Sequence, residues 1–487
     1  MQSDRLAGAR SPLLFLCFIA LLSALAFAQT DPAVSGQWSA VVQWSTPSPG
    51  WVPTHAILLP TGKVLYVSSY TDGAKPKIWN PATGAITPAA LPGYDLFCMG
   101  HALLANGSVL MTGGHVADYV GYAHSTVYDP FANTFTRKAD MNAGRWYPTN
   151  TTLSNGDVLV VSGTKTSSSD YNNLPQVFQT STGTFRSLTN AVLRLQLYPF
   201  MFLAPNGKVF LAGWQPDTRY LDTAGTGLWT KVANTNFGWR NYGSAVMYQT
   251  GKILIIGGGG NVAGGALPTR TAEVIDLNSA SPVWKYVASM AFPRRQQNAT
   301  LLPDGKVLVT GGSSGSGFDN WHSPVYAAEM WDPATNTWKT LARAANYRGY
   351  HSFALLLPDG RVLTGGGQVN AAGQANGANI QIYSPPYLFK GARPTISSFP
   401  ASVTYGSTKL IGTPDVSSIT SVSWVRLGAV THSFDQNQRF TTLKFTRVSG
   451  GVSVVFPANS KISPPGHYML FILKSGIPSV GKIIRIG

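Results

Sequence analysis

A short pattern of polar and hydrophobic positions recurs along the chain. It has a turn glycine, a polar residue and then a hydrophobic run that ends at Gly or Ser, as in Gly62-Lys-Val-Leu and Gly107-Ser-Val-Leu. The same pattern returns, at intervals of 44 to 55 residues, at Gly156, Gly207, Gly251, Gly305 and Gly360. A glycine before such a run is typical of a hairpin turn, and the interval is that of a four-stranded propeller blade. The pattern therefore predicts seven repeated β units.

A second pattern follows each of the first and resembles a strand that enters a turn, as in Ile78-Trp-Asn-Pro and Met330-Trp-Asp-Pro. Seven copies of each pattern predict an all-β fold, namely a seven-bladed kelch-type β-propeller over residues 35–390. The strand-like segment from Gln37 to Trp44 is expected to close the ring with the last blade. Tryptophans that follow the second pattern, Trp229, Trp284 and Trp338, are expected to pack between blades.

The rhythm stops after Pro385-Pro386-Tyr387, and shorter alternating strands follow. They are expected at Val422–Leu427, Thr441–Arg447, Val452–Phe456 and Tyr468–Lys474. Their number and length predict an immunoglobulin-like β-sandwich over residues 391–487.

Residues 1–28 have the features of an export signal. Arg5 and Arg10 form a positive start, an apolar stretch runs from Leu13 to Phe27, and Ala26-Phe27-Ala28 is typical of a cleavage site. No segment is long and apolar enough to predict a membrane span. The protein is expected to be secreted, whether to the periplasm, the cell surface or the medium, and to be a monomer.

The charge is positive but thinly spread. Loss of the leader removes Arg5, Arg10 and Asp4 and lowers the formal charge from +16 to +15. With 11% charged residues and no Lys/Arg run, this charge favours weak attraction to acidic cell-surface polysaccharide. Without a basic stripe or a recognition motif, the sequence does not favour nucleic acid as a partner.

Reactive residues occur at one position of the repeat. Cys98, Tyr147 and His351 each stand nine residues before the pattern glycine of their repeat. The full set at this offset is Pro53, Cys98, Tyr147, Tyr198, Tyr242, Gln296 and His351. Equal offsets imply equivalent positions, so these side chains are expected to converge around the central channel. Cys98 is also the one cysteine that remains once the leader, with Cys17, is removed.

These residue types favour a copper site. Imidazole nitrogen and phenolate oxygen suit Cu(II), whose tetragonal preference accepts two histidines and two oxygens in a plane. Of eight histidines, His351 is the one in register, so a second imidazole must come from elsewhere, such as a loop of the following domain. The alternative is structural: a buried inert thiol, tyrosines that cap a channel, and a hydrogen-bonded core histidine.

The chain resembles the copper radical oxidases, the family of galactose oxidase and especially glyoxal oxidase. The resemblance is carried by Asp95-Leu-Phe-Cys98, Gly144-Arg-Trp-Tyr147-Pro, Arg348-Gly-Tyr350-His351-Ser, Thr431-His432-Ser and the closing Pro465-Gly466-His467-Tyr. It implies a thioether cross-link between Cys98 and Tyr147, made by copper and oxygen. It also implies that Tyr147 is a copper ligand and radical carrier, that His351 and His432 are ligands, and that Tyr350 is the axial ligand and base. Dioxygen would then be reduced to hydrogen peroxide.

The departures from the family pattern concern the substrate. The position of a tryptophan that stacks on the cross-linked tyrosine of galactose oxidase is Lys165 here, and a substrate-binding glutamine is replaced by Ser313. These differences favour a small aldehyde hydrate or a simple alcohol over galactose, with a surface glycan left open. Candidates for the pocket wall are Trp146, Tyr198, Arg240 and Tyr242.

Two other functions are alternatives to the oxidase. A non-catalytic propeller that binds glycan or a protein partner would make Cys98, Tyr147, Tyr350, His351 and His432 coincidental. A propeller hydrolase needs paired carboxylates near the axis, and no residue at the shared offset is acidic. The remaining histidines, His55, His101, His115, His124, His322 and His467, are expected to have structural or surface roles.

Overall fold

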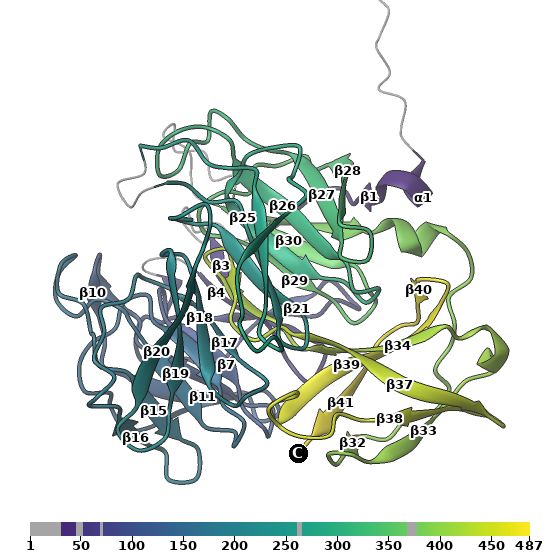
Figure 1. The fold of residues 1–487 in the computed structure, drawn as a ribbon, viewed down its shortest axis with the longest axis horizontal. Coiled ribbons are helices and arrows are strands. Elements are labelled where there is room, and N and C mark those ends of the chain that lie inside the picture. Colours follow the sequence, from purple (N-terminus) through teal and green to yellow (C-terminus); the bar gives the residue numbers. More distant parts are fainter. Residues whose placement is uncertain (1–30, 45–51, 69–71, 261–264, 368–376) are drawn as a thin grey trace, which may run out of the picture.

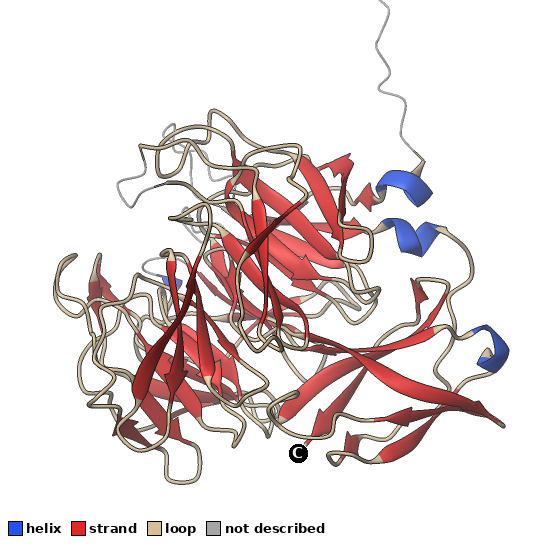
Figure 2. Ribbon diagram, in the orientation of Figure 1, coloured by secondary structure: helices blue, strands red, loops and turns tan. Residues whose placement is uncertain are grey.

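The computed structural model describes residues 31–44, 52–68, 72–260, 265–367 and 377–487, and strands dominate it (Figures 1 and 2). The leader predicted for residues 1–28 lies outside the described residues. Short helices are found at α1 (Pro32–Ser35), η2 (Pro386–Phe389) and η3 (Val416–Ser418). In the described part of the chain, no helix has the length and apolarity needed to span a membrane.

Seven antiparallel sheets in the described residues form the blades of a propeller. Blade one has β3 (Pro53–Leu58), β4 (Val64–Ser68), β5 (Lys77–Trp79) and β6 (Ile86–Pro88); blade two has β7 (Gly100–Leu103), β8 (Val109–Thr112), β11 (Ser125–Asp129) and β12 (Thr134–Arg137). Blade three has β13 (Thr149–Thr152), β14 (Val158–Val161), β15 (Gln176–Gln179) and β16 (Thr184–Ser187); blade four has β17 (Phe200–Leu203), β18 (Val209–Gly213), β19 (Asp217–Asp222) and β20 (Leu228–Asn234). Blade five has β21 (Ser244–Gln249), β22 (Lys252–Ile256), β23 (Ala272–Asp276) and β24 (Lys285–Val287). Blade six has β25 (Arg295–Leu301), β26 (Val307–Ser313), β27 (Ala327–Asp332) and β28 (Thr337–Arg343).

The last blade is closed by the start of the chain. Its strands are β29 (Ser352–Leu356), β30 (Val362–Gly366) and β31 (Asn379–Ser384), and β1 (Gln37–Trp38) and β2 (Val42–Gln43) both pair with β31. Trp38 pairs with Tyr383 in this register. The N-terminal strand therefore supplies the outer edge of the last blade, as the strand-like segment predicted.

The pattern glycines lie in the turns between the first and second strands of the blades. From Gly62 to Gly360, all seven have φ between 75° and 92°. This left-handed conformation is readily adopted by glycine and costs other residues free energy, which explains why the residue recurs.

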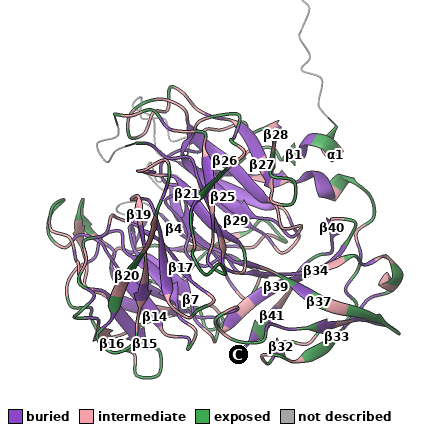
Figure 3. Ribbon diagram, in the orientation of Figure 1, coloured by how far each residue is buried: buried purple, intermediate pink, exposed green. Residues whose placement is uncertain are grey.

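The innermost strands are buried and the outermost strands face solvent. All residues of β3, β7, β13 and β17 are buried, whereas β16 and β20 are largely exposed or half-buried (Figure 3). The tryptophans after the second pattern join neighbouring blades, because the indole N–H of Trp229 donates to the Ala191 carbonyl and that of Trp338 to the Ala288 carbonyl.

The C-terminal domain packs beside the propeller (Figure 1). Its strands are β32 (Ser402–Val403), β33 (Thr408–Gly412), β34 (Ser421–Arg426), β37 (Phe440–Val448), β38 (Gly451–Val455), β39 (Gly466–Lys474), β40 (Ile477–Pro478) and β41 (Lys482–Ile486). The first half of β37 pairs with β34 and its second half with β38, so this long strand joins the two parts of the sandwich. Trp424, Ile411 and Val454 lie in the core that the domain encloses.

A hairpin of the C-terminal domain enters the propeller. Its strands are β35 (Ala429–Thr431) and β36 (Phe434–Asp435), and β35 pairs with the innermost strand β3, with Thr431 opposite His55. The Asp435 carboxylate closes the hairpin by accepting hydrogen bonds from the backbone N–H groups of Ala429 and Asn437 at 2.9 and 3.0 Å. This hairpin brings residues of the second domain to the central channel.

Candidate metal centre

The positions nine residues before the pattern glycines are structurally equivalent. Except for the proline, all of them have positive φ: Cys98 65°, Tyr147 68°, Tyr198 45°, Tyr242 51°, Gln296 63° and His351 66°. Each residue lies at the start of the innermost strand of its blade, or just before it. Positive φ is uncommon for residues other than glycine and concentrates at functional sites. The shared conformation turns these side chains toward one region at the channel mouth.

Cys98 and Tyr147 are held together by their backbones. The Tyr147 N–H donates to the Cys98 carbonyl at 2.9 Å, and both side chains lie in one buried cluster. Burial raises the pKa of the Cys98 thiol well above its usual value, and the Tyr147 hydroxyl, within hydrogen-bonding reach, lowers it in part. The Cys98 N–H donates to Nε2 of His55 at 3.2 Å. The two residues predicted from adjacent blades are therefore in contact.

Tyr350 and His351 reach the same point from the last blade. Their rings stack with centroids 3.8 Å apart, and the Tyr350 hydroxyl is hydrogen-bonded to the Tyr147 hydroxyl. His351 Nε2 lies 3.3 Å from Tyr147 Oη. Burial lowers the pKa of His351 to about 3, so its ring is neutral and carries a lone pair.

His432 supplies the second imidazole, from the turn of the β35–β36 hairpin. Its ring centroid lies 4.4 Å from that of Tyr147 and 4.7 Å from that of His351. The Thr431 hydroxyl engages Nδ1 at 2.6 Å, whereas Nε2 is buried with no hydrogen-bond partner among the described residues. An unpartnered buried nitrogen costs free energy unless a ligand occupies it.

Other bonds of this hairpin hold His432 in place. The Gln436 side-chain oxygen accepts hydrogen bonds from the backbone N–H groups of His101 in blade two and Asn150 in blade three, at 3.3 and 3.0 Å. Gln438 bonds in both directions with blade six, through Leu301 N–H and the Ala299 carbonyl. The position of His432 therefore depends on both domains.

These four groups fit copper. Two phenol oxygens and two neutral imidazole nitrogens converge at one buried point, and this N/O set is the one that Cu(II) prefers. Burial raises the pKa of the Tyr147 hydroxyl well above its usual value, with further contributions from Cys98 and Tyr350. A phenolate there therefore needs a bound cation to stabilise it. The candidate ligands are Tyr147, Tyr350, His351 and His432.

Trp146 provides the stacked ring that the family comparison had assigned to the position of Lys165. The Trp146 and Tyr147 rings are 3.6 Å apart and 6° from parallel. Lys165 instead pairs with Asp170 at 2.8 Å. Because Trp146 directly precedes Tyr147 in the sequence, comparison at the position of Lys165 could not identify it as the stacking residue.

His115 lies at this site, although the sequence predicts only a structural or surface role for it. It lies on β9 (His115–Ala117), which with β10 (Val120–Gly121) forms a hairpin inserted between β8 and β11. Its Nδ1 accepts a hydrogen bond from the Trp146 indole N–H at 3.2 Å, and its ring contacts Phe97. His115 therefore orients the indole that covers Tyr147.

A pocket of about 430 Å³ opens onto this site. Trp146 and Tyr242 line it, together with Tyr147, Tyr350 and His351. Tyr198 does not line this pocket but borders a smaller cavity beside it, with Tyr242 and His432. It is buried against Tyr147, with ring centroids 4.6 Å apart, and its hydroxyl donates to the Met99 carbonyl at 2.8 Å.

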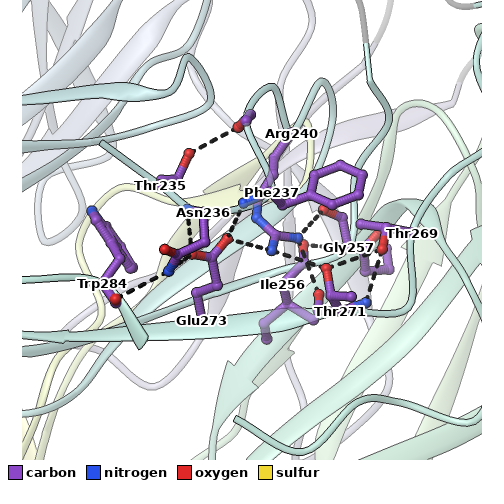
Figure 4. Close-up of polar contacts among 12 residues, drawn as sticks. Thr235, Asn236, Phe237, Arg240, Ile256, Gly257, Thr269, Thr271, Glu273 and Trp284 are labelled. Atoms are coloured by element: carbon purple, nitrogen blue, oxygen red, sulfur yellow. Dashed lines mark hydrogen bonds and ion pairs between the residues drawn. The ribbon is translucent and has the colours of Figure 1, made fainter. Parts of the chain in front are cut away.

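Arg240 corrects the prediction for the pocket wall, because it does not reach the pocket. Its guanidinium is fully buried and donates to the Glu273 carboxylate at 2.7 Å and to the Gly257 carbonyl at 2.9 Å (Figure 4). The same carboxylate accepts hydrogen bonds from Asn236. Arg240 therefore ties the blade-five loop to β23 and has a structural role.

We expect Glu273→Ala to lower the free energy of unfolding by about 3–5 kcal/mol, because it leaves the Arg240 charge buried without its partner. Denaturant unfolding of the holoprotein measures this change. Lys252→Ala is the matched control on the neighbouring strand β22: its partner Asp276 lies 3.7 Å away and both side chains are partly exposed, so a loss below about 1 kcal/mol is expected. Equal losses in the two variants would contradict a structural role for the buried pair.

Comparison with known proteins agrees with this geometry. Residues 73–387 match the family model described as the glyoxal oxidase N-terminus, and residues 393–486 match the galactose oxidase-like early set domain. The chain is 32% identical to a galactose oxidase of Gibberella zeae, with 89% of this chain and 69% of the relative covered. It is 30% identical to the aldehyde oxidase GLOX of Vitis pseudoreticulata, with 80% and 82% covered.

Among solved structures, a fungal alcohol oxidase of the AA5 family in complex with copper is similar, with a TM-score of 0.82 and 27% identity. The match covers 93% of this chain and 99% of that structure. The predicted fold, a seven-bladed propeller followed by an immunoglobulin-like domain, is confirmed. The chain belongs to the glyoxal oxidase family and is a copper-dependent oxidase that acts on alcohol or aldehyde groups with dioxygen as acceptor.

Proposed function

We propose that this protein is a copper radical oxidase that converts a primary alcohol to an aldehyde, or a hydrated aldehyde to an acid, and reduces dioxygen to hydrogen peroxide. The observation that carries the proposal is the meeting of Tyr147, Tyr350, His351 and His432 at one buried point. Two domains and two distant blades contribute to this arrangement, which a non-catalytic binding module would not require.

Copper would be held by the phenol oxygens of Tyr147 and Tyr350 and by Nε2 of His351 and His432. When bound, it would supply one oxidising equivalent and acidify the substrate hydroxyl. The protein residues then divide the remaining work. Tyr350, which lines the pocket, is placed to take the hydroxyl proton as a phenolate.

Tyr147 would be the second redox centre. As a radical it takes the hydrogen atom from the substrate carbon and becomes a phenol. Loss of that hydrogen atom, the hydroxyl proton and one further electron converts the CH–OH group to a carbonyl. Dioxygen takes up the two electrons and two protons as hydrogen peroxide. Trp146 covers one face of Tyr147 and keeps water from it.

A thioether between Cys98 and Tyr147 would make the Tyr147 radical easier to form. Formation of the C–S bond removes the thiol hydrogen and one ring hydrogen, and dioxygen accepts the two electrons and two protons as peroxide. The sulfur substituent enriches the ring and eases its oxidation. Contact between the two residues at the Cys98 carbonyl supports this step. Export is supported by the leader-like sequence at residues 1–28.

Mass spectrometry of the mature protein, before and after exposure to copper and air, tests the proposal. We expect the mass to fall by two hydrogens, with the Cys98 and Tyr147 peptides covalently joined and peroxide released on addition of alcohols or aldehydes. If one copper binds while the Cys98 thiol can still be alkylated, the radical oxidase proposal is wrong. The protein is then a binding module that holds copper in a catalytically inactive site.

A further inference from the structure

The pocket above the metal centre has an aromatic interior. Of the fifteen described residues that line it, nine are phenylalanine, tyrosine or tryptophan. Phe318 and Tyr242 contact the edge of Tyr350, with ring centroids 4.6 and 5.7 Å away, and Phe97 contacts His351 at 5.2 Å. The group that carries the reacting carbon must therefore lie among ring faces and edges.

The polar lining groups lie at different depths. Asp118 and Ser168 are exposed, whereas Asn241 is buried, as are Trp146 and Trp214. The indole N–H groups of Trp146 and Trp214 donate to His115 and to the Leu197 carbonyl, so they are already engaged within the protein. These two indoles therefore offer a substrate the apolar contact of their rings rather than hydrogen bonds.

The aromatic wall is held firmly, although one of its members is exposed. Phe318 is 41% exposed, but the Gln296 side-chain amide donates to its carbonyl at 2.7 Å, and Arg295 donates to the neighbouring Gly317 carbonyl. Gln296 is the blade-six member of the equivalent set, with positive φ like the others. An exposed phenylalanine anchored in this way is preorganised for a ligand rather than for the protein core.

The charge of the wall opposes an anionic substrate. Among the lining residues in the described part of the chain, Asp118 carries the one formal charge, and it is negative. The nearby Arg295 side chain donates hydrogen bonds to the carbonyls of Gly317 and Ala266. A substrate carboxylate held away from the metal would therefore meet the negative charge of Asp118, and no Lys or Arg is among the described lining residues to bind it.

The volume of the pocket favours a substrate larger than a two-carbon aldehyde. A cavity of roughly 150 Å³ accommodates benzene, so about 430 Å³ has room for a ring with a substituent. A two-carbon aldehyde would leave most of the aromatic surface in contact with water.

We propose that the substrate is a neutral aryl-substituted primary alcohol, or the hydrate of an aryl aldehyde, whose ring packs against the aromatic wall formed by Phe318, Tyr242 and Trp214. This proposal rests on the oxidase function proposed above. The reaction is that of the preceding subsection: the arylmethanol loses two hydrogens to give the aldehyde, and dioxygen becomes hydrogen peroxide.

The test compares benzyl alcohol, galactose, methylglyoxal and glyoxylate by peroxide release from the copper-loaded enzyme. We expect the highest kcat/KM with benzyl alcohol and the lowest with glyoxylate. Binding of benzyl alcohol to the copper-free protein, followed by tryptophan fluorescence, provides a readout that is independent of turnover. Quenching that saturates is expected there, because Trp146 and Trp214 line the pocket.

The variant Phe318→Ala tests whether the substrate ring packs against this part of the pocket wall. It should lower the ratio of kcat/KM for benzyl alcohol to that for methylglyoxal by about tenfold and weaken benzyl alcohol binding by a similar factor. Phe131→Ala is the matched control, because Phe131 is also exposed but lies outside the pocket, and the ratio should not change. Activity that favours methylglyoxal or galactose, with an intact cross-link, overturns the aryl proposal alone. Absence of both cross-link and peroxide overturns it together with the oxidase proposal.

Discussion

His432→Ala should abolish tight copper binding and, with it, oxidase activity. His432 Nε2 is a buried nitrogen left without a partner among the described residues, and its ring faces both Tyr147 and His351. Removal of a residue that only supports a metal ligand typically costs 10–100-fold in affinity, so loss of a ligand should cost more than about 100-fold. Titration of the apoprotein with Cu(II), with metal content measured after dialysis, gives the affinity.

The control for this variant is His467→Ala in the same domain. His467 lies beside Gly107, in the turn of blade two that is at the other end of β7 from Cys98. Copper binding in this variant should match the wild type. If His432→Ala retains one copper at wild-type affinity, His432 is not a ligand and the assignment of the fourth group is wrong.

Cys98→Ser should leave copper binding largely intact while it removes the cross-link and most of the activity. The thiol is outside the set of four donors, but it lies against Tyr147 in the same buried cluster. Without the sulfur substituent the Tyr147 ring is harder to oxidise, and we expect kcat to fall by about 100-fold. Intact mass should show no loss of two hydrogens, and the radical signal in electron paramagnetic resonance should be absent.

Met99→Leu tests whether such a loss could come from repacking alone. Met99 is the next residue, is fully buried and can be replaced at nearly constant volume, which typically costs less than about 1.5 kcal/mol. This variant should form the cross-link and keep its activity. Full activity with a normal radical signal in Cys98→Ser would show that the thioether is dispensable.

Much of the centre could be predicted from the repeat because a propeller repeats its backbone. Equal offsets from Gly107 and Gly156 place Cys98 and Tyr147 at the same backbone position of adjacent blades, and the structure shows them with nearly equal φ and a direct hydrogen bond. The same argument located His351. It could not reach His432, which belongs to another domain and was suggested by family resemblance alone.

Arg240 and Tyr198, which do not line the main pocket, show where periodicity stops being informative. Arg240 and Tyr242 are two residues apart, yet Tyr242 lines the pocket and Arg240 is buried against Glu273, which is thirty-three residues away in the chain. Tyr198 holds the same repeat position as Tyr242 but is covered and bonded to Met99. A repeat position specifies where the backbone turns, whereas neighbouring elements decide whether a side chain meets solvent.

By itself, the sequence determined the blade count, the ring closure, the second domain and the set of equivalent positions, because glycine turns and strand alternation are local properties of the chain. Only the tertiary structure decided that a hairpin of the second domain enters the channel with His432, that Trp146 covers Tyr147, and that an aromatic pocket lies above the site. These features depend on contacts between segments far apart in sequence, and such contacts are set by packing and hydrogen-bond satisfaction in the folded molecule.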